Sequence, residues 1–495
     1  MPTDGAAERI GRFDIDEIVA SLPSDTPDVR RTLVQTFAVP YLRRMSDADL
    51  KELTPDALAA EILDLVAFVD ERRGAACAVR VFTPTESANG YTAGGTVVEV
   101  VVDDMPFLVD STALAVARSG AGIERHLHPL VGVVRDADGQ LMAIEPARSV
   151  ARTESIQHFE LDRHLSAADQ EVLQSEITRV LGDVRVAVAD FEAMRVVVTE
   201  MIGSAKASVA RYGYQEIEET VEFLEWLLDD NFVFLGYKIY DVSGPDDDLM
   251  IQARAESGLG ILRANGKPQK AVPMADLPNY VQGRYFGGDL VVITKTNSHA
   301  TVHRDARMDY IGLRQTNEQG RTEVEMRLIG LFTSKAYMAT ASEIPVLRRK
   351  LSQILERQDL LEGSHDYKTL VQLFESFPKD DLFAMPVEDL SRTLGALIDS
   401  EEFEHVRLFV RKDPLQRSVG ILVTVPRDRF NADLRIQLQE LFRAEFGAQT
   451  IDYRLSLGES GDARIHFTVW LASPAPMEVD VPSLETKVLA LARTW

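Results

Sequence analysis

The sequence predicts a multi-domain α+β protein, with ferredoxin-like layers of strands and helices joined by helical segments. The chain of 495 residues is 45% hydrophobic, so several packed units are expected instead of a single core. Strand and helix patterns alternate within 76–182 and again within 401–473, as in a ferredoxin-like layer. Helical periodicity dominates 1–75, 183–230 and 343–400.

The composition of the chain is strongly acidic. Lys and Arg number 53 against 78 Asp and Glu, a formal charge of −25, which argues against general binding to nucleic acids or anionic membranes. The single cysteine, Cys77, excludes a disulfide framework and a thiolate metal cluster. The first residues lack the apolar core of a signal peptide, and no apolar run is long enough to span a bilayer. We therefore expect a soluble cytoplasmic protein with no nucleic-acid or membrane partner.

The first half of the chain is expected to begin with helices. "DIDEIVASL" and "DALAAEILDLVAFVDERR" carry apolar residues at helical spacing, and Ser46 is a suitable N-cap for "SDADLKEL". A Gly-rich connector near 83–95 then precedes the strand "GTVVEVVV" and the helix "LVDSTALAVARSG". A long strand, a hairpin turn, a return strand, a further strand and a helix follow, in "GIERHLHPLVGVVRD", "DADG", "QLMAIEP", "ESIQHFELD" and "SAADQEVLQSEITRVLG".

The second half is expected to change from β-rich to helical and back. Aromatic and β-branched residues in "FVFLGYKIYDV" introduce a β-rich region over 231–342. Helical patterns return over 343–400, and a second α/β unit over 401–473 repeats the architecture of the first around the helix "ADLRIQLQELFRAEFG". Residues 474–495 predict the start of a helix that continues into a longer parent chain.

Asp110 and Ser111 allow two interpretations. With His126 or His128 as the base, Ser111 could be a hydrolase nucleophile, which needs a base within hydrogen-bond reach and an oxyanion hole. The sequence has no G-x-S-x-G elbow, and Asp or Ser at a helix start ordinarily accepts backbone N–H bonds as a cap. The capping interpretation is favoured.

The histidine pair His126 and His128 raises the question of a metal site. Two residues apart in a strand, both side chains point to one face, but a third ligand with suggestive spacing is missing from the sequence. A structural histidine pair is favoured, and His299 and His303 receive the same interpretation. We assign no metal ligand.

A basic cluster lies in "KTNSHATVHR". Lys295, His303 and Arg304 gather positive charge in an acidic chain, with Ser298 among the hydroxyls between them, which suits an anion such as a carboxylate or a phosphate. The alternative is a solvated strand face paired with nearby acids. We take Lys295, Ser298, His303 and Arg304 as candidate residues for a regulatory ligand.

Nucleotide-binding motifs are missing from the sequence. No G-x-G-x-x-G stands between a strand and a helix, and no G-x-x-x-x-G-K-[ST] occurs. We therefore assign no catalytic or cofactor-binding residue and expect no cofactor in this segment. The patterns alone indicate a multi-domain sensing or assembly protein.

The stretch "DDMPFLVDS" resembles the start of an ACT domain, a small βαββαβ module that often binds amino acids. In that family the first strand enters a turn of the form D-[RK]-P-G-L-L before a helix, and Asp104, Pro106, Phe107 and Leu108 match this turn here. The resemblance implies that backbone N–H groups at the turn face a carboxylate. Phe107 replaces the glycine, where backbone approaches a ligand closely, so a purely structural role is the alternative.

A longer resemblance covers most of the chain. Collinear motifs are similar to those of the large, bacterial-type NAD-specific glutamate dehydrogenases, among them "HPLVGVVRDADGQL", "EFLEWLLDDNFVFLGYKIY", "ITKTNSHATVHR" and "TVPRDRFNADLR". The resemblance implies the N-terminal region of such an enzyme, with ACT-like modules at 76–182 and 401–473. It also implies a PAS-like region at 231–342.

That family converts L-glutamate, NAD and water to 2-oxoglutarate, ammonia and NADH. The resemblance implies NAD as cofactor of the parent enzyme, catalytic domains beyond this segment, self-association into a homo-oligomer, and a small amino-acid or carboxylate effector. A free-standing sensor of amino acids or carboxylates is the alternative. A metal-dependent hydrolase is a third class, which rests only on the histidines.

Overall fold

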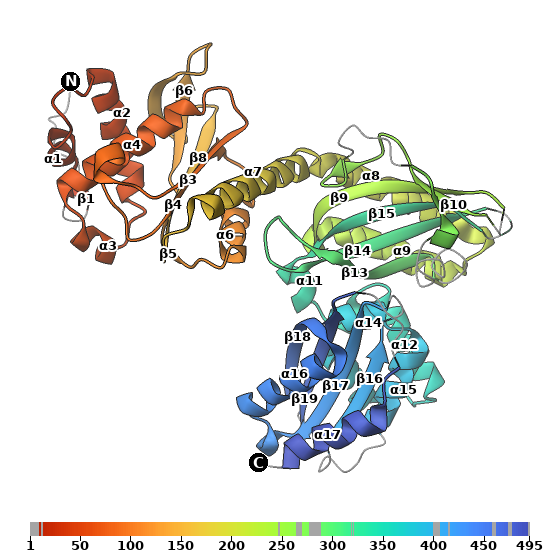
Figure 1. The fold of residues 1–495 in the computed structure, drawn as a ribbon. Coiled ribbons are helices and arrows are strands. Elements are labelled where there is room, and N and C mark those ends of the chain that lie inside the picture. The colour runs from red at the N-terminus through yellow and green to blue at the C-terminus, as the bar shows by residue number, and fades with distance from the viewer. Residues whose placement is uncertain are drawn as a thin grey trace. The chain divides into compact units, whose positions relative to one another are not determined.

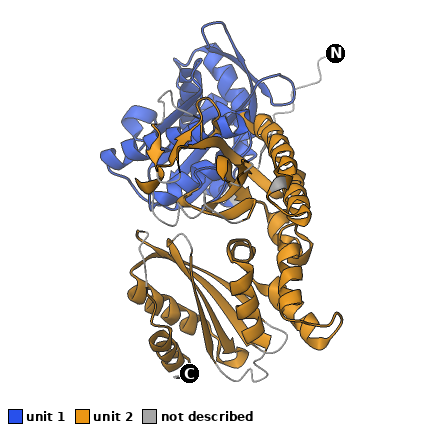
Figure 2. Ribbon diagram, turned by 90° about the vertical axis from the view of Figure 1, so that its right-hand side faces the viewer, with its two compact units in different colours: residues 1–189, 300–306 blue, residues 190–299, 307–495 orange. Residues whose placement is uncertain are grey.

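The computed structural model describes residues 9–10, 13–245, 248–263, 270–276, 289–317, 319, 321–398, 406–413, 416–457, 462–473 and 478–493. The chain divides into two compact units (Figure 2), Met1–Ala189 with Ala300–Ala306, and Asp190–His299 with Arg307–Trp495. Helices and strands are mixed along both units (Figure 1), as the sequence predicts.

The first unit is built on a six-stranded antiparallel sheet. Its strand order is β3-β4-β8-β6-β7, and β5 also pairs with β8. The strands are β3 (Cys77–Phe82), β4 (Val97–Asp103), β5 (Ile123–Leu127), β6 (Leu130–Arg135), β7 (Leu141–Pro146) and β8 (Thr153–Leu161). Every residue of β4 before Asp103 is buried, which means that both faces of this strand are covered.

Helices of the N-terminal segment cover one face of that sheet. Helices α1 (Ile15–Ala20), α2 (Asp28–Leu42) and α4 (Pro55–Glu71) share a hydrophobic core with strand residues such as Val101 and Ile156. Ser46 caps α3 (Asp47–Glu52), as predicted. Two further helices, α6 (Leu108–Arg118) and α7 (Ala167–Ala189), pack against each other. The remaining short elements are β1 (Arg9–Ile10), β2 (Phe13–Asp14) and α5 (Glu86–Asn89).

The second unit begins with two helices and a seven-stranded antiparallel sheet. Helices α8 (Phe191–Ala207) and α9 (Tyr214–Trp226) pack together, and α8 contacts β9 and β14. The strand order is β12-β10-β9-β15-β14-β13, with β11 paired to β9. The strands are β9 (Phe232–Ser243), β10 (Met250–Ala253), β11 (Leu259–Gly260), β12 (Val272–Pro273), β13 (Val291–His299), β14 (Arg307–Thr316) and β15 (Thr322–Phe332). The PAS-like description of this region stays a prediction.

Helices connect this sheet to a smaller, four-stranded one. They are α11 (Ser334–Met338), α12 (Leu347–Arg357), α13 (His365–Ser376), α14 (Lys379–Ala384) and α15 (Val387–Ile398). The small sheet has the order β16-β17-β19-β18 and shares its core with α16 and α17. Its elements are β16 (Arg407–Lys412), β17 (Ser418–Pro426), α16 (Ala432–Phe446), β18 (Ala448–Leu457), β19 (Asp462–Leu471) and α17 (Val481–Arg493).

Four strands of the six-stranded sheet have the same topology as the four-stranded sheet of the second unit. Four strands of the first unit lie in the order β3-β4-β8-β5, and those of the second unit lie in the order β16-β17-β19-β18. In each, one helix follows the second strand and another follows the last strand. The β6-β7 pair is an addition to the first sheet. This correspondence confirms the architectural repetition predicted from the sequence.

Two local predictions are wrong. The long strand expected over 122–136 is two strands, β5 and β6, because Pro129 has no backbone N–H to donate and restricts the conformation of His128. The predicted capping of α6 by Asp110 or Ser111 also fails. That helix begins at Leu108, and Phe107 at its N-cap makes no side-chain capping bond.

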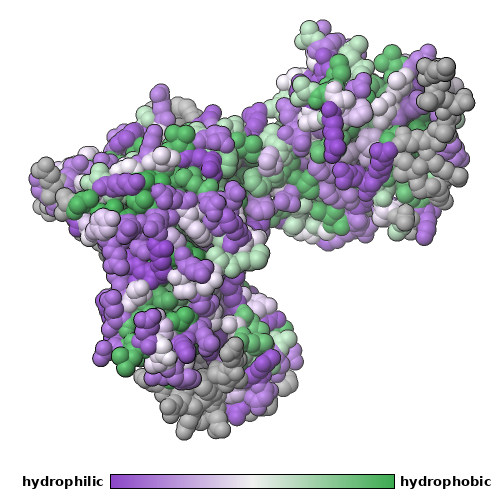
Figure 3. Space-filling model, turned by 180° about the vertical axis from the view of Figure 1, so that it is seen from behind, coloured by the Kyte–Doolittle hydropathy of each residue, from purple (hydrophilic) through white to green (hydrophobic). Residues whose placement is uncertain are grey.

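The surface carries both hydrophilic and hydrophobic side chains (Figure 3). Hydrophilic side chains are widespread on the face drawn in Figure 3, with hydrophobic ones distributed among them. Among the described residues, every helix is too short or too polar to cross a membrane.

Candidate functional site

The turn between β4 and α6 contains a residue in a left-handed backbone conformation. Phe107 has a φ of 72°, in the left-handed region that favours glycine. Asp104 is tied to the sheet because its N–H donates to the carbonyl of Thr153 at 3.0 Å. Asp104 and Pro106 are exposed, whereas Leu108 is buried under the turn. The residue at the glycine position of the motif therefore has a backbone conformation that glycine adopts without strain.

The turn is covered by a loop from a distant part of the sequence. Residues Ala300–Ala306, called here the 300–306 loop, belong to the first unit. The ring of His303 lies 5.2 Å from that of Phe107. Its backbone N–H donates to Ser111 Oγ at 3.0 Å, and its Nδ1 lies 3.3 Å from Asp110 Oδ2. Phe107 and His303, predicted as candidates for separate reasons, are thus in contact.

Further contacts hold the 300–306 loop in place. Arg118 donates to the carbonyl of Ala300 at 2.9 Å and forms an ion pair with Asp305 at 2.7 Å. Thr301 Oγ1 donates to Asp183 Oδ2 at 2.8 Å. Arg304 lies half-buried in the same loop. Ser111 Oγ donates to the carbonyl of Phe107 at 2.6 Å, so its hydroxyl links helix, turn and loop.

The other two residues of the basic cluster belong to the second unit. Lys295 Nζ lies 2.6 Å from Asp309 and 3.1 Å from Asp380, with its side chain 17% exposed. Burial alone would lower the pKa of Lys295, but the charges of Asp380 and Asp309 outweigh it and raise that pKa. Burial also raises the pKa of Asp309, to about 6, against the charge of Lys295. The Ser298 carbonyl accepts from Thr296 Oγ1 at 2.8 Å.

The histidine pair packs against the first sheet. The His126 ring stacks on Phe159 at 4.1 Å and lies 6.3 Å from the His128 ring, nearly parallel to it. His128 Nε2 lies 2.8 Å from Ser155 Oγ. Burial lowers the pKa of His126 to about 4, with the charge of His128 adding to the effect. The interpretation of the two residues as a structural pair stays a prediction.

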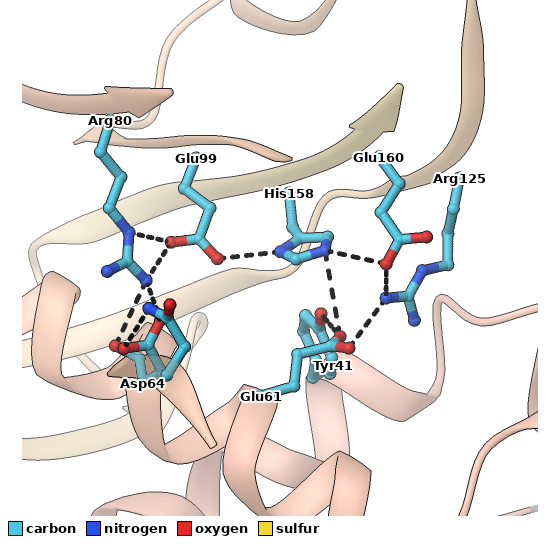
Figure 4. Close-up of polar contacts among 9 residues, drawn as sticks. Tyr41, Glu61, Asp64, Arg80, Glu99, Arg125, His158 and Glu160 are labelled. Atoms are coloured by element: carbon cyan, nitrogen blue, oxygen red, sulfur yellow. Dashed lines mark hydrogen bonds and ion pairs between the residues drawn. The ribbon is translucent and has the colours of Figure 1, made fainter. Parts of the chain in front are cut away.

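A buried polar network between α4 and the first sheet was missed by the sequence analysis (Figure 4). Cross-strand pairing places Arg80 opposite Glu99, Glu99 opposite His158, and Arg125 opposite Glu160. Glu99 accepts from Arg80 at 2.5 Å and lies 2.9 Å from His158 Nδ1.

Side chains of the covering helices complete this network. Glu61 of α4 pairs with Arg125 at 2.8 Å and accepts from Tyr41 of α2, while Arg125 also pairs with Glu160. Asp64 of α4 pairs with Arg80 at 2.6 Å. The network therefore joins two N-terminal helices to four neighbouring strands, β3, β4, β8 and β5.

The charges of the network shift the pKa values of its members. Burial would lower the pKa of His158, but the carboxylates of Glu160 and Glu99 outweigh it and raise that pKa to about 9. Burial would raise the pKa of Glu160, but His158 and Arg125 lower it to about 2. The sequence signal was a strand with polar residues two apart, His158 and Glu160, in a region of hydrophobic strands.

Comparison with known proteins identifies the domains of the chain. Three family models match: the ACT1 domain of glutamate dehydrogenase over residues 37–177, its helical motif 1 over 344–402, and its ACT2 domain over 407–495. An NAD-specific glutamate dehydrogenase of Halomonas elongata is 33% identical over 468 residues. The chain belongs to the NAD-specific glutamate dehydrogenase family. The ACT1 match begins inside α2, consistent with the core that this helix shares with the sheet.

Relatives in this family are much longer than the chain. The alignment with the Halomonas elongata enzyme covers 93% of this chain and 29% of the relative. An NAD-specific glutamate dehydrogenase of Pseudomonas aeruginosa is 33% identical over 84% of this chain and 26% of its own length. One from Mycobacterium tuberculosis is 26% identical over 81% of this chain and 24% of its own length. The chain therefore spans less than a third of each of these glutamate dehydrogenases.

Proposed function

We propose that the chain is the regulatory and oligomer-forming N-terminal region of an NAD-dependent glutamate dehydrogenase. In this proposal, catalysis with NAD takes place in parts of the enzyme outside residues 1–495. The two ACT modules with one topology support a regulatory role, and the names of the matched relatives support the reaction. The PAS-like character of the middle sheet is part of the same proposal.

The main structural support for the regulatory role is the turn before α6. Its left-handed residue, Phe107, makes no side-chain capping bond to the first N–H groups of α6, and a helix N-terminus stabilises a carboxylate by hydrogen bonds and by the helix dipole. His303 and the 300–306 loop contact this turn. An amino-acid or carboxylate effector would bind beside the loop or displace it, and either event would change the contacts of His303.

Self-association is supported by an edge strand of the second ACT module. β18 lies at the edge of its sheet, and Tyr453, Leu455 and Leu457 on one face of it are 44%, 41% and 49% exposed. An edge strand with exposed apolar side chains is suited to pairing with a second copy. We propose that this edge contributes to the homo-oligomer of the parent enzyme.

Thermal unfolding with candidate effectors tests the regulatory role. Each of the twenty amino acids and a set of dicarboxylates is added to the chain, because a ligand that binds only the folded state raises Tm. We expect at least one to raise Tm in the parent and to do so less in a Phe107→Trp variant, whose larger ring fills the turn. An Ile436→Ala variant, altered at an exposed position of α16, is the control.

Enzyme assays separate the proposal from its alternative. We expect residues 1–495 alone to show no NAD-dependent oxidation of glutamate, and the complete parent protein to show it and to respond to the same effector. A thermal response without glutamate oxidation by the complete protein would favour a free-standing sensor. No Tm shift with any amino acid or dicarboxylate, together with unregulated activity, would contradict the regulatory role.

A further inference from the structure

Three side chains of the buried network converge on one point. Among the described residues, Glu61, His158 and Glu160 each offer a ligand atom, and these atoms lie within 4.8 Å of one another. Glu61 comes from α4, whereas His158 and Glu160 come from one face of β8 (Figure 4). His158 is fully buried and Glu61 nearly so, while the Glu160 side chain is 19% exposed. Glu160 is therefore the most exposed of the three side chains.

One ring nitrogen of His158, Nε2, faces the carboxylates of Glu61 and Glu160. Its Nδ1 lies 2.9 Å from Glu99 Oε1. Its Nε2 is buried and makes no hydrogen bond in the described part of the chain, at 4.0 Å from Glu61 Oε1 and 3.9 Å from Glu160 Oε1. These separations are too long for hydrogen bonds. Two ligands of a tetrahedral Zn²⁺ lie about 3.4 Å apart, so a shift of roughly 0.5 Å would bring the three atoms to coordination distance.

The surroundings of His158 match those of a metal-binding histidine. Metal-binding histidines usually hold their second ring nitrogen against a carboxylate, which fixes the ring and increases its basicity. Glu99 provides that carboxylate and is itself held by Arg80 at 2.5 Å. Arg125 contacts Glu61 through Oε2, whereas Glu61 Oε1 accepts from the Tyr41 hydroxyl and lies 4.0 Å from His158 Nε2.

The network has more negatively than positively charged side chains, so its charge balance can accommodate a divalent cation. Four carboxylates, those of Glu61, Asp64, Glu99 and Glu160, face two guanidinium groups, those of Arg80 and Arg125. The imidazolium of His158 adds a third positive charge, and a divalent ion that replaces its ring proton brings the positive charges to four, equal to the negative ones. Buried charges that are fully paired are the least costly arrangement.

We propose that Glu61, His158 and Glu160 bind a divalent transition-metal ion of the Zn²⁺ type, which fastens α4 to the sheet of the ACT1 domain. The donor set of one imidazole and two carboxylates suits Zn²⁺ and similar ions. Glu99 is a positioning residue in this site. On binding, the ion takes Glu160 Oε1 from Arg125, whose Nε and Nη1 are buried without partners in the described structure and can turn to the other oxygen.

Calorimetry with the metal alone tests the site. The complete chain is stripped with a chelator and titrated with ZnCl₂, and its thermal unfolding is followed with and without the metal. We expect one Zn²⁺ per chain and a higher Tm when it is bound. His158→Gln and Glu160→Gln are expected to weaken binding at least tenfold, and Glu99→Gln to weaken it roughly 10- to 100-fold through the ring orientation. His128→Gln, in the neighbouring pair, should bind like the parent.

Cobalt provides an independent readout. Co²⁺ in the parent should give visible absorption bands of a site with nitrogen and oxygen ligands, and His158→Gln should lose them. If His158→Gln does not fold, Glu160→Gln decides, because its side chain is partly exposed and its substitution removes one ligand. Absence of Zn²⁺ binding to the parent, or equal binding by the parent and a folded Glu160→Gln variant, overturns the proposal.

Discussion

His158 of β8 and His466 of β19 lie on corresponding strands of the two ACT modules, and each is followed directly by a buried phenylalanine. Their surroundings are opposite. Carboxylates around His158 raise its pKa to about 9, whereas burial, with the charges of Arg464 and Arg454, lowers the pKa of His466 to about 3. The corresponding strands therefore hold a histidine whose surroundings favour the charged imidazole in the first module and the neutral one in the second.

His466 makes the second unit sensitive to acid. Its folded-state pKa is depressed, so its contribution to stability is present above pH 6.5 and is lost as pH falls toward 3. Between pH 7 and pH 5 we expect a loss of about 2 kcal/mol that His466→Gln abolishes. Urea unfolding followed by Trp fluorescence measures this, because Trp226, Trp470 and Trp495 all belong to the second unit. A matched substitution of the exposed residue, His365→Gln, is the control. Equal pH dependence of the unfolding free energy in the parent and in His466→Gln would refute the prediction.

Lys295 neutralises two carboxylates in the second unit. A Lys295→Met substitution leaves Asp309 and Asp380 without their shared cation, so we expect a loss of about 3 kcal/mol in unfolding free energy. The double variant Lys295→Met, Asp309→Asn should recover part of it, since the amide oxygen can still accept from Phe332 N. Urea unfolding followed by Trp fluorescence measures the unfolding free energy of both variants. If the unfolding free energy of Lys295→Met lies within 0.5 kcal/mol of that of the parent, Lys295 and its two carboxylate partners are solvated.

At position 107 we expect the glycine variant to be more stable than the alanine variant, which is the reverse of the usual order of stability in a helix. At its φ of 72°, Phe107→Gly should be more stable than Phe107→Ala by about 1 kcal/mol, because only glycine adopts this conformation without strain. At Val172, exposed on α7, alanine should exceed glycine by about 1 kcal/mol. Chemical unfolding followed by circular dichroism compares the four variants. Alanine as stable as glycine at position 107 would contradict the strained backbone.

Ser111 should protect the 300–306 loop from hydrogen exchange. Its Oγ accepts from His303 N, so Ser111→Ala should speed exchange of that amide roughly tenfold, as expected for the loss of about 1.4 kcal/mol of protection. Thr112→Ala is the matched control, because its hydroxyl donates within α6, to the carbonyl of Leu108. Mass spectrometry of peptides spanning the loop gives the rates. Identical protection in parent and Ser111→Ala would mean that other contacts hold the loop.

The exposed edge of β18 should drive self-association. Leu455→Lys places a charge among the apolar side chains of this strand, so we expect the complex to dissociate at concentrations where the parent remains associated. Sedimentation velocity over a wide concentration range measures the masses. Val172→Lys, at an exposed position of α7, should not change them. A strictly monomeric parent would refute a role for this edge.

Local sequence patterns predicted the parts of the fold that depend on neighbouring residues. The strand, helix and turn order of both ACT modules follows from periodicity over a few residues, and Ser46 at the start of α3 follows from capping chemistry. The special conformation of Phe107 could be anticipated because a motif fixed it at a glycine position.

Contacts between distant segments could not be predicted in this way. Glu61 and His158 meet only because α4 folds onto β8, and no local pattern encodes that pairing. Lys295 was grouped with His303 because they are close in sequence. The register of β13 shifts between Lys295 and His299, so side chains in this stretch do not follow a simple alternation. The structure places Lys295 and Ser298 in the second unit and His303 and Arg304 in the first.

The 300–306 loop also has a consequence for the order of events during synthesis. The first unit includes these seven residues, yet the ribosome must continue from Ala189 to Ala306 before they exist. At the usual rate of elongation this takes roughly 6 to 23 seconds. During that interval the turn at Phe107 lacks its cover, so a nascent chain passes through a period in which the contacts of His303 with Phe107 and Ser111 have not yet formed.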